Sequence, residues 1–221
     1  MKALNTLILF VSVNLTVLGT TQIPDILIYN GKEYRLLNYL METYFDKNPN
    51  MRPKIEQCST GLYRGYIATF EIKDNQLFLK DFVIMDDKKD ENGKWKTGWK
   101  SIINEVFPNQ EYIKVNWIIG LIEVVSGEKN DWIKHSFDFD FDYYIVFEID
   151  EGNLNKEKWF ERKEYEIFKE NQFQAFKETD EYRRLKIELL ERNKMIYTNA
   201  NVDWYIRLHI IRYSSKILVE E

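Results

Sequence analysis

Cysteine is almost absent from this chain of 221 residues, which contains Cys58 alone. A single cysteine excludes a disulfide within the chain, so stability must come from packing. We expect Cys58 to behave as a small buried apolar side chain, the commoner state of a lone cysteine. The alternative, in an exported chain, is a thiol that reacts or pairs with another molecule.

Histidine is also scarce, and the only two, His135 and His209, lie far apart without a zinc-binding spacing. Three aspartates, Asp138, Asp140 and Asp142, begin like a calcium-binding loop. The glycine and the bidentate glutamate that complete such a loop are missing, so we interpret the three carboxylates as a solvated strand face. The sequence predicts no metal site and no cofactor.

An excess of basic charge is also lacking. The chain has 31 Lys and Arg against 36 Asp and Glu, a net charge of −5. Nucleic acid requires a dense basic face, so we expect neither nucleic acid nor an anionic membrane as a partner. The sequence further lacks a nucleophile elbow, a phosphate-binding glycine loop and a Cys/His nucleophile motif.

One long apolar run is present, at the N-terminus. Lys2 precedes about 15 mostly apolar residues, 4–18, and small residues follow at 19–21. This pattern predicts a secretory signal peptide over residues 1–19, cut after Gly19 or alternatively after Thr21. The run is shorter than the roughly 20 residues that cross a bilayer, so we expect export to the periplasm or the medium, without an integral membrane segment once the leader is removed.

Aromatic residues make up 15% of the chain, with six Trp, fourteen Tyr and fourteen Phe. In alternating runs they indicate strands around a bulky core. They could also form stacking platforms for sugars or peptides. Composition does not separate these two interpretations.

Alternating apolar residues predict two hairpins. The first spans residues 26–37 around Asn30-Gly31, and the second spans residues 66–85 around Asp74-Asn75. Further strands are expected at 115–121, 143–149 and 202–210. Within the first of these, the glycine at position 120 indicates a bulge or a close backbone approach. Over 202–210 a helical period competes, but the alternation of Val202, Trp204, Ile206, Leu208 and Ile210 and the β-branched content favour a strand.

Helical spacing predicts an amphipathic stretch over 37–45 and a short helix over 99–107, after a charged surface loop at 86–98. Two helices are expected at 165–176 and 179–189, the second capped by a threonine at 179, the alternative being one helix with a break near Glu178. We therefore predict one α+β domain over residues 20–221. It consists of an antiparallel sheet of about five to seven strands, with a short inserted helix and a C-terminal helical pair packed on the sheet.

Two groups of residues are binding candidates. Tyr63 and Arg64 lie in a glycine-containing aromatic loop, where an arginine fork beside ring faces suits a carboxylate or a sugar. The alternative is a strand entry in which Arg64 pairs with a local acid. Tyr205, Arg207 and His209 would share one face of the strand expected at 202–210.

Glu148 is the catalytic candidate. Glycoside hydrolysis needs two carboxylates whose separation is set in space rather than in sequence. With 36 acidic residues, some such pair always exists. Glu148 is singled out because it lies on an expected strand, on the side opposite the apolar face.

Residues 59–81, 99–110 and 213–218 resemble a group of small exported bacterial proteins that carry no assigned activity. The resemblance covers most of the chain after the leader. It implies a bacterial source and a single domain, and it implies no catalytic residue, cofactor or substrate.

Two classes of function remain open. The first is a non-catalytic binding module for a protein or a glycan, expected to present an exposed apolar patch or coplanar exposed rings. The second is a carboxylate-dependent hydrolase acting on an envelope or extracellular glycan, expected to hold Glu148 or another acid in a deep cleft. The absence of catalytic motifs together with the abundance of aromatics favours the binding module.

Overall fold

The structure, a computed structural model, describes residues 22–55, 59–110, 112–127, 141–192 and 196–219. The strands are β1 Asp25–Tyr29, β2 Lys32–Leu36, β3 Tyr66–Lys73, β4 Gln76–Met85, β5 Lys88–Lys89, β6 Trp95–Lys96, β7 Trp99–Ser101, β8 Ile113–Lys114, β9 Ile119–Ser126, β10 Tyr143–Asp150 and β11 Asn153–Glu161. The helices are α1 Leu40–Lys47, the 3-10 turn η1 Pro49–Met51, α2 Ile103–Val106, α3 Arg162–Lys177, α4 Asp180–Arg192, α5 Val202–Leu208 and α6 Ile210–Tyr213.

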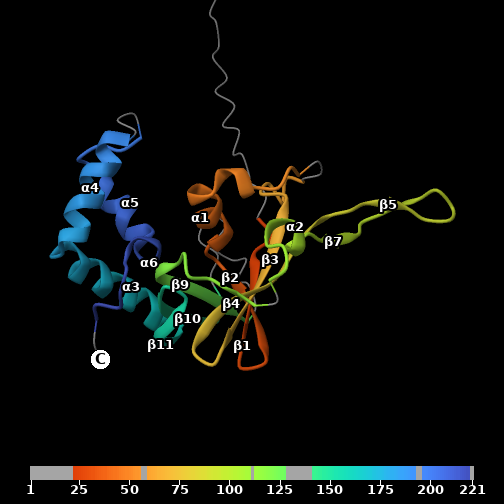
Figure 1. Ribbon diagram of the computed structural model, residues 1–221. Coiled ribbons are helices and arrows are strands. Elements are labelled where there is room, and N and C mark those ends of the chain that lie inside the picture. Colours follow the sequence, from red (N-terminus) through yellow and green to blue (C-terminus); the bar gives the residue numbers. More distant parts are fainter. Residues whose placement is uncertain (1–21, 56–58, 111, 128–140, 193–195, 220–221) are drawn as a thin grey trace, which may run out of the picture.

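Seven strands close into a barrel-like sheet in the order β11-β10-β9-β2-β1-β3-β4, because β11 pairs back to β4 at Asn153 and Gln76. The short strands β7 and β8 add to β4. Figure 1 shows α1 beside the barrel, the helices α3 to α6 gathered at one side, and the β5–β6 hairpin projecting from the other. The α+β class is thus confirmed.

Both predicted hairpins are confirmed, and their turns explain the strand register. Asn30 and Gly31 adopt positive φ angles of 50° and 74°, and Asp74 and Asn75 adopt 50° and 57°. These left-handed angles match the twist of the flanking strands, and asparagine, aspartate and glycine reach them at least cost. The β1–β2 and β3–β4 pairs follow directly.

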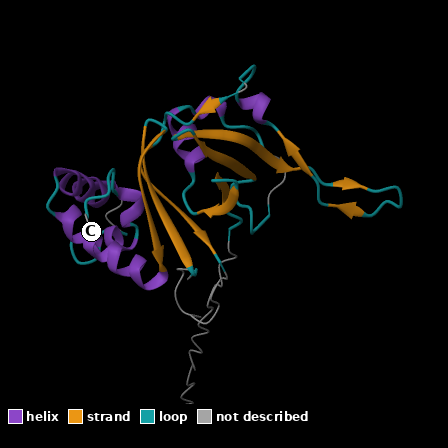
Figure 2. Cartoon of the chain, turned by 90° about the horizontal axis from the view of Figure 1, so that it is seen from below, coloured by secondary structure: helices purple, strands orange, loops and turns teal. Residues whose placement is uncertain are grey.

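The sheet has two buried sides, because it holds a core inside the barrel and packs helices outside it. Inside, residues such as Leu27, Phe70 and Phe147 are fully buried. Outside, Tyr144 and Val146 of β10 pack against the apolar stripes of the helices. Figure 2 shows these helices on one side of the strands. This arrangement explains why six consecutive residues of β10 are buried.

The expectation of a purely antiparallel sheet is wrong, because β1 and β3 run parallel. The chain leaves β2, passes through α1 and returns on the other side of β1, which is the crossover that a parallel pair requires. Alternation along a strand encodes which face is buried, but it does not encode the direction of the neighbouring strand.

The region 86–107 also differs from the prediction. Within the expected surface loop, β5 and β6 pair as a small separate hairpin. Within the expected helix, Trp99–Ser101 forms β7 on the edge of β4, and only Ile103–Val106 is helical. The helix is short because Ile102 donates its backbone N–H to Phe82 of β4, so its backbone belongs to the sheet edge.

The strand expected over 115–121 begins later, since β9 starts at Ile119 and continues to Ser126. The residues before it form a turn in which Ile118 donates to the carbonyl of Val115. Trp117 therefore packs on Phe107 and α1 rather than on the sheet, with an indole N–H bond to the carbonyl of Leu40 at 3.0 Å. A turn lined by apolar side chains imitates a strand in sequence.

The charged segment after Glu151, for which no strand was predicted, forms strand β11, Asn153–Glu161, before α3. Only one face of β11 is turned toward the protein, and most of the charged side chains of the strand are at its solvent-exposed positions. The two predicted helices are confirmed as α3 and α4. The cap is confirmed as well, since Thr179 Oγ1 accepts the backbone N–H of Tyr182 at 3.1 Å.

The strand expected over 202–210 is wrong, and the chain there forms α5 and α6. Val202, Ile206 and Ile210 recur at steps of four residues and are each fully buried against the other helices. Trp204, which the strand pattern placed on the same face, is 63% exposed. The buried stripe thus follows the helical period, and β-branched content did not decide the structure.

Candidate functional site

A cleft of about 440 Å³ lies between α1, the first residues of β9 and α6. Both polar and apolar side chains line it: the polar ones come from α1, the two residues before it and α6, and the isoleucines come from β9 and the residue before it. The lining residues are Asn38, Tyr39, Leu40, Thr43, Lys47, Trp117, Ile118, Ile119, Gly120, Leu121, Ile122 and Arg212.

The cleft opens because β2 and β9 separate after only two paired positions, Arg35 with Val125 and Leu36 with Val124. Beyond them, the buried side chain of Asn38 takes the place of a neighbouring strand. Its amide nitrogen donates to the carbonyl of Leu121 at 3.3 Å, and its amide oxygen accepts the N–H of Glu123 at 2.7 Å. The Asn38 amide thus satisfies one donor and one acceptor of β9, while the main chain turns away into α1.

The opposite wall depends on Gly120. Its φ is +139°, and a Cβ at this position would lie 3.4 Å from the carbonyl oxygen of Ser214. The adjoining N–H of Leu121 donates to that carbonyl at 3.1 Å. The distance of 3.4 Å is an ordinary van der Waals contact, so the positive φ rather than a lack of space favours glycine here. The bond from Leu121 to Ser214 holds the end of α6 against β9, and this contact brings Arg212 to the cleft.

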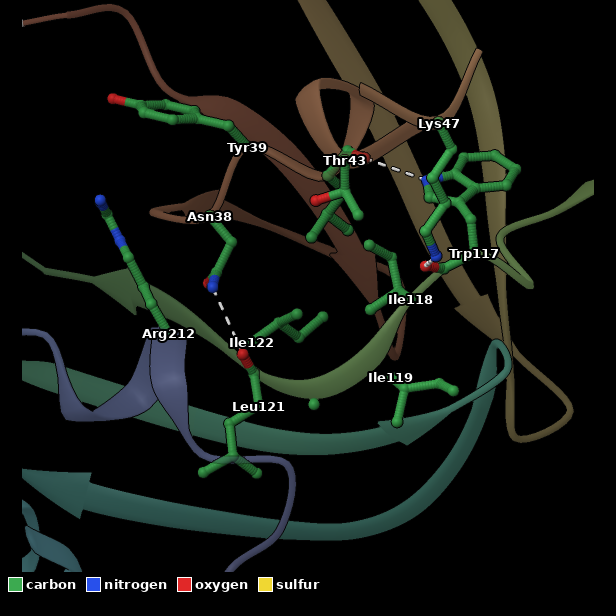
Figure 3. A pocket seen from close by; sticks show the side chains of 12 residues that line it. Asn38, Tyr39, Thr43, Lys47, Trp117, Ile118, Ile119, Leu121, Ile122 and Arg212 are labelled. Atoms are coloured by element: carbon green, nitrogen blue, oxygen red, sulfur yellow. Dashed lines mark hydrogen bonds between the residues drawn. The ribbon is translucent and has the colours of Figure 1, made fainter. Parts of the chain in front are cut away.

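Two cations, Lys47 on α1 and Arg212 on α6, lie at opposite ends of the cleft (Figure 3). The Lys47 ammonium donates to the carbonyl of Trp117 at 3.1 Å, and the Arg212 guanidinium donates to the carbonyl of Leu37 at 3.3 Å. Both side chains are exposed. The lining contains no aspartate and no glutamate, so Lys47 and Arg212 give it a net positive charge.

Tyr39 links this cleft to a buried ion pair. The guanidinium carbon of Arg212 lies 5.6 Å from the centre of the Tyr39 ring, and that of Arg64 lies 4.2 Å from it. Arg64 in turn pairs with Asp25, Nη1 to Oδ2 at 2.8 Å, and Asp25 Oδ1 accepts the N–H of Ala68 at 2.9 Å. Attraction between cations and the ring face thus holds Tyr39 and Arg212 in place.

The Asp25–Arg64 pair extends into a cluster of titratable groups. Tyr66 donates its hydroxyl to Glu42 at 2.6 Å, and Glu42 accepts two bonds from Arg52. Burial raises the pKa of Asp25 above its usual range, against the attraction of Arg64. Burial and the bond to Glu42 raise the pKa of Tyr66 far above its usual range. The cluster is internally paired and lies outside the cleft lining, so we interpret it as support for the wall.

The structure does not bring the predicted binding residues together. Arg64 pairs with an acid, although its partner Asp25 lies far away in sequence. Tyr63 is 83% exposed and does not line the cleft. In α5, Tyr205 contacts the His209 ring at 4.7 Å, while Arg207 pairs with Glu170 of α3 at 2.6 Å. Tyr205, Arg207 and His209 therefore do not all share one face, because a helix replaces the expected strand.

Glu148 lies in β10 and is only 6% exposed. One of its carboxylate oxygens accepts the backbone N–H of Ile217 at 2.8 Å. The carboxylate therefore anchors the C-terminal segment on the barrel, and it does not line the cleft.

Several sequence predictions lie outside the described residues: the signal peptide, Cys58, His135, Asp138 and Asp140. In the parts of the chain that are described, no three potential metal-ligating side chains come together. Across those same parts, no helix has both the length and the apolar character needed to cross a membrane.

Sequence reasoning missed the residues that form the cleft, Asn38, Lys47 and Arg212. An asparagine after a strand, a lysine at a helix end and an arginine near the C-terminus are common in any surface. The one usable signal was Gly120, whose place within a strand predicted a bulge or a close backbone approach; the second is what the bond from Leu121 to Ser214 shows.

Comparison with known proteins adds no assignment: no protein-family model matches this chain, and neither does any curated protein or solved structure.

Proposed function

We propose that this chain is an exported, non-catalytic binding module that holds a protein partner in the cleft between α1, β9 and α6. The observation that carries the proposal is the lining itself: an apolar floor with two exposed cations and without a carboxylate. Such a combination of apolar surface and a few oriented polar groups is typical of ligand sites.

The chemistry of the lining favours binding over hydrolysis. A glycosidase needs two carboxyl groups on either side of the scissile bond, and the cleft supplies none. Glu148, the acid that the sequence offered, is engaged with the backbone of Ile217.

A protein partner is favoured over a neutral glycan. Flat sugar rings stack on exposed aromatic faces, and in the cleft the guanidinium groups of Arg64 and Arg212 lie over the Tyr39 ring. Within the cleft, Trp117 is stacked on Phe107 and only partly exposed. Export is supported separately by the N-terminal pattern, Lys2 followed by the apolar run.

The test is co-purification of the full chain, carrying a C-terminal tag, from the cell envelope of its own host. Thr43 lines the cleft and Asp46, one turn away in α1, does not. Thr43→Phe fills the cleft, and Asp46→Phe adds the same ring to the same helix outside it. Circular dichroism of both variants checks that they fold.

We expect a stoichiometric protein with the wild type and with Asp46→Phe, and its loss with Thr43→Phe. A partner retained equally by all three would place binding elsewhere and contradict the site. A chain that carries nothing under any condition would contradict the binding module. Intact mass and cell fractionation test export: a product that begins at Thr20 outside the cytoplasm supports it, and an uncut cytoplasmic chain contradicts it.

A further inference from the structure

The charge of the cleft runs against the charge of the chain. The protein carries a net charge of −5, yet Lys47 and Arg212 are the charged side chains of the lining. Neither forms an ion pair with a carboxylate of the described residues, whereas buried Arg64 and exposed Arg52 and Lys100 do. Unpaired cations on both ends of one cleft select for an anionic ligand.

Both cations keep donors for such a ligand. An ammonium has three N–H donors and a guanidinium has five. Lys47 uses one on the carbonyl of Trp117, and Arg212 uses one on the carbonyl of Leu37. These bonds hold the ammonium and the guanidinium group at the cleft without neutralising their charge, so each group can still donate to a carboxylate.

The strand that forms the floor points to a polypeptide. Successive residues of a strand direct their N–H and C=O groups to alternate sides. On the side away from β10, Glu123 is bonded by Asn38 and Leu37, and Leu121 is bonded by Asn38 and Ser214. The same alternation directs the N–H and C=O of Ile119, two residues earlier, to that side, where β2 is no longer present.

Ile119 also supplies apolar surface, since its side chain is 61% exposed at the cleft. An extended peptide laid along this edge can pair with the backbone of Ile119 and cover its side chain. An anionic sugar chain offers the carboxylates but lacks the regular amide donors that such an edge accepts.

We propose that the cleft binds an extended acidic segment of a partner polypeptide. Its main chain lies beside Ile119, and its carboxylates accept hydrogen bonds from Arg212 at one end and Lys47 at the other. This inference rests on the proposed function and names the chemistry of its partner.

Fluorescence anisotropy with the full chain tests it on defined probes. The first probe is a labelled octapeptide of alternating glutamate and leucine, and the second has glutamine at each glutamate. Poly-L-glutamate and polygalacturonate, as unlabelled competitors, present the same carboxylates on a peptide and on a sugar backbone. The variants are Lys47→Gln and Arg212→Gln, with Lys32→Gln and Arg184→Gln as matched controls outside the lining.

We expect the glutamate peptide to bind and the glutamine peptide to bind much more weakly. Each cleft variant should weaken binding by about two- to five-fold, the range of exposed ion pairs, and the pair of variants by about ten-fold. Binding should weaken further as salt is raised from about 0.05 M to 0.5 M. Lys32→Gln and Arg184→Gln should leave the affinity unchanged, and poly-L-glutamate should compete better than polygalacturonate.

Four results would overturn the inference. Equal binding of both peptides, or equal loss in the control variants, would show that cleft charge does not select the ligand. Better competition by polygalacturonate would assign the cleft to an anionic glycan. The last result is that neither peptide binds, while the wild type still captures the envelope partner and Thr43→Phe still loses it. The proposal of an acidic segment would then be wrong, and the proposal of a binding module would stand.

Discussion

Replacing Arg64 by methionine tests whether the buried Asp25–Arg64 ion pair stabilises the wall behind the cleft. The arginine side chain is 9% exposed and its partner Asp25 is fully buried, with 2.8 Å between Nη1 and Oδ2. Methionine preserves the length and apolar stem but leaves the carboxylate without its cation. Breaking one partner of a buried pair costs about 3–5 kcal/mol, a large part of the roughly 5–15 kcal/mol that stabilises a typical domain.

The loss should depend on pH with a definite sign. Burial raises the pKa of Asp25 in the folded state above its unfolded value, so the folded state binds this proton more tightly. Its contribution to stability is present below the unfolded pKa and is lost as pH rises through the folded pKa. Removal of Arg64 raises the folded pKa further. The deficit of Arg64→Met relative to the wild type should therefore shrink between pH 7 and pH 4.

Urea unfolding followed by tryptophan fluorescence measures both effects, since the chain holds six Trp. The matched control is the double variant Asp25→Asn with Arg64→Met. Asparagine keeps the oxygen that accepts the N–H of Ala68 but carries no charge. This double variant should recover at least about half of the loss at pH 7. The reasoning is refuted if it is no more stable than Arg64→Met alone, or if the deficit is equal at both pH values.

Three further predictions concern stability. Gly120→Ala forces a side chain onto a φ of +139° and should cost about 1–3 kcal/mol in urea unfolding, with faster amide exchange next to it. Unchanged stability would contradict the backbone strain assigned to this position. Tyr165→Phe removes the hydroxyl that donates to Glu123 and should cost about 1.5–3 kcal/mol; a neutral effect would argue against the bond. Ile206→Ala should cost about 2–5 kcal/mol, whereas Trp204→Ala should stay within about 0.5 kcal/mol; similar losses would support a strand over α5.

The parts of the fold that sequence predicted are those in which local chemistry decides the structure. The turns at Asn30-Gly31 and Asp74-Asn75 need positive φ angles, and few residue types adopt them. The cap at Thr179 and the stripe of α4 depend on residues within one or two turns. In each case the interacting groups are close in sequence, so the pattern contains the information.

The errors arise where partners distant in sequence decide. β11 is charged and would suit a helix surface, but pairing with β10 holds it in the sheet. Conversely, Val202, Ile206 and Ile210 form the buried stripe of α5 and α6 because other helices are present to receive it. Strand propensity describes how well a side chain fits a pleated surface, and it gives way when no such surface is available.

The cleft depends on a long-range event of the same kind. β2 pairs with β9 at two residue positions only. After them, the side chain of Asn38 forms the hydrogen bonds to β9, and the main chain leaves the sheet to form α1. The end of α6 approaches from the other side, where Leu121 donates to the carbonyl of Ser214, and each of the two helices contributes one cation. Since Lys47 and Arg212 are 165 positions apart in the chain, no spacing rule relates them. What relates them is the interrupted pairing of β9, because the same interruption that opens the cleft also leaves Ile119 at a sheet edge. The interrupted pairing of β9 and the approach of α6 together place two cations beside an open strand edge, and the extended, anionic ligand proposed above is of the kind that satisfies both.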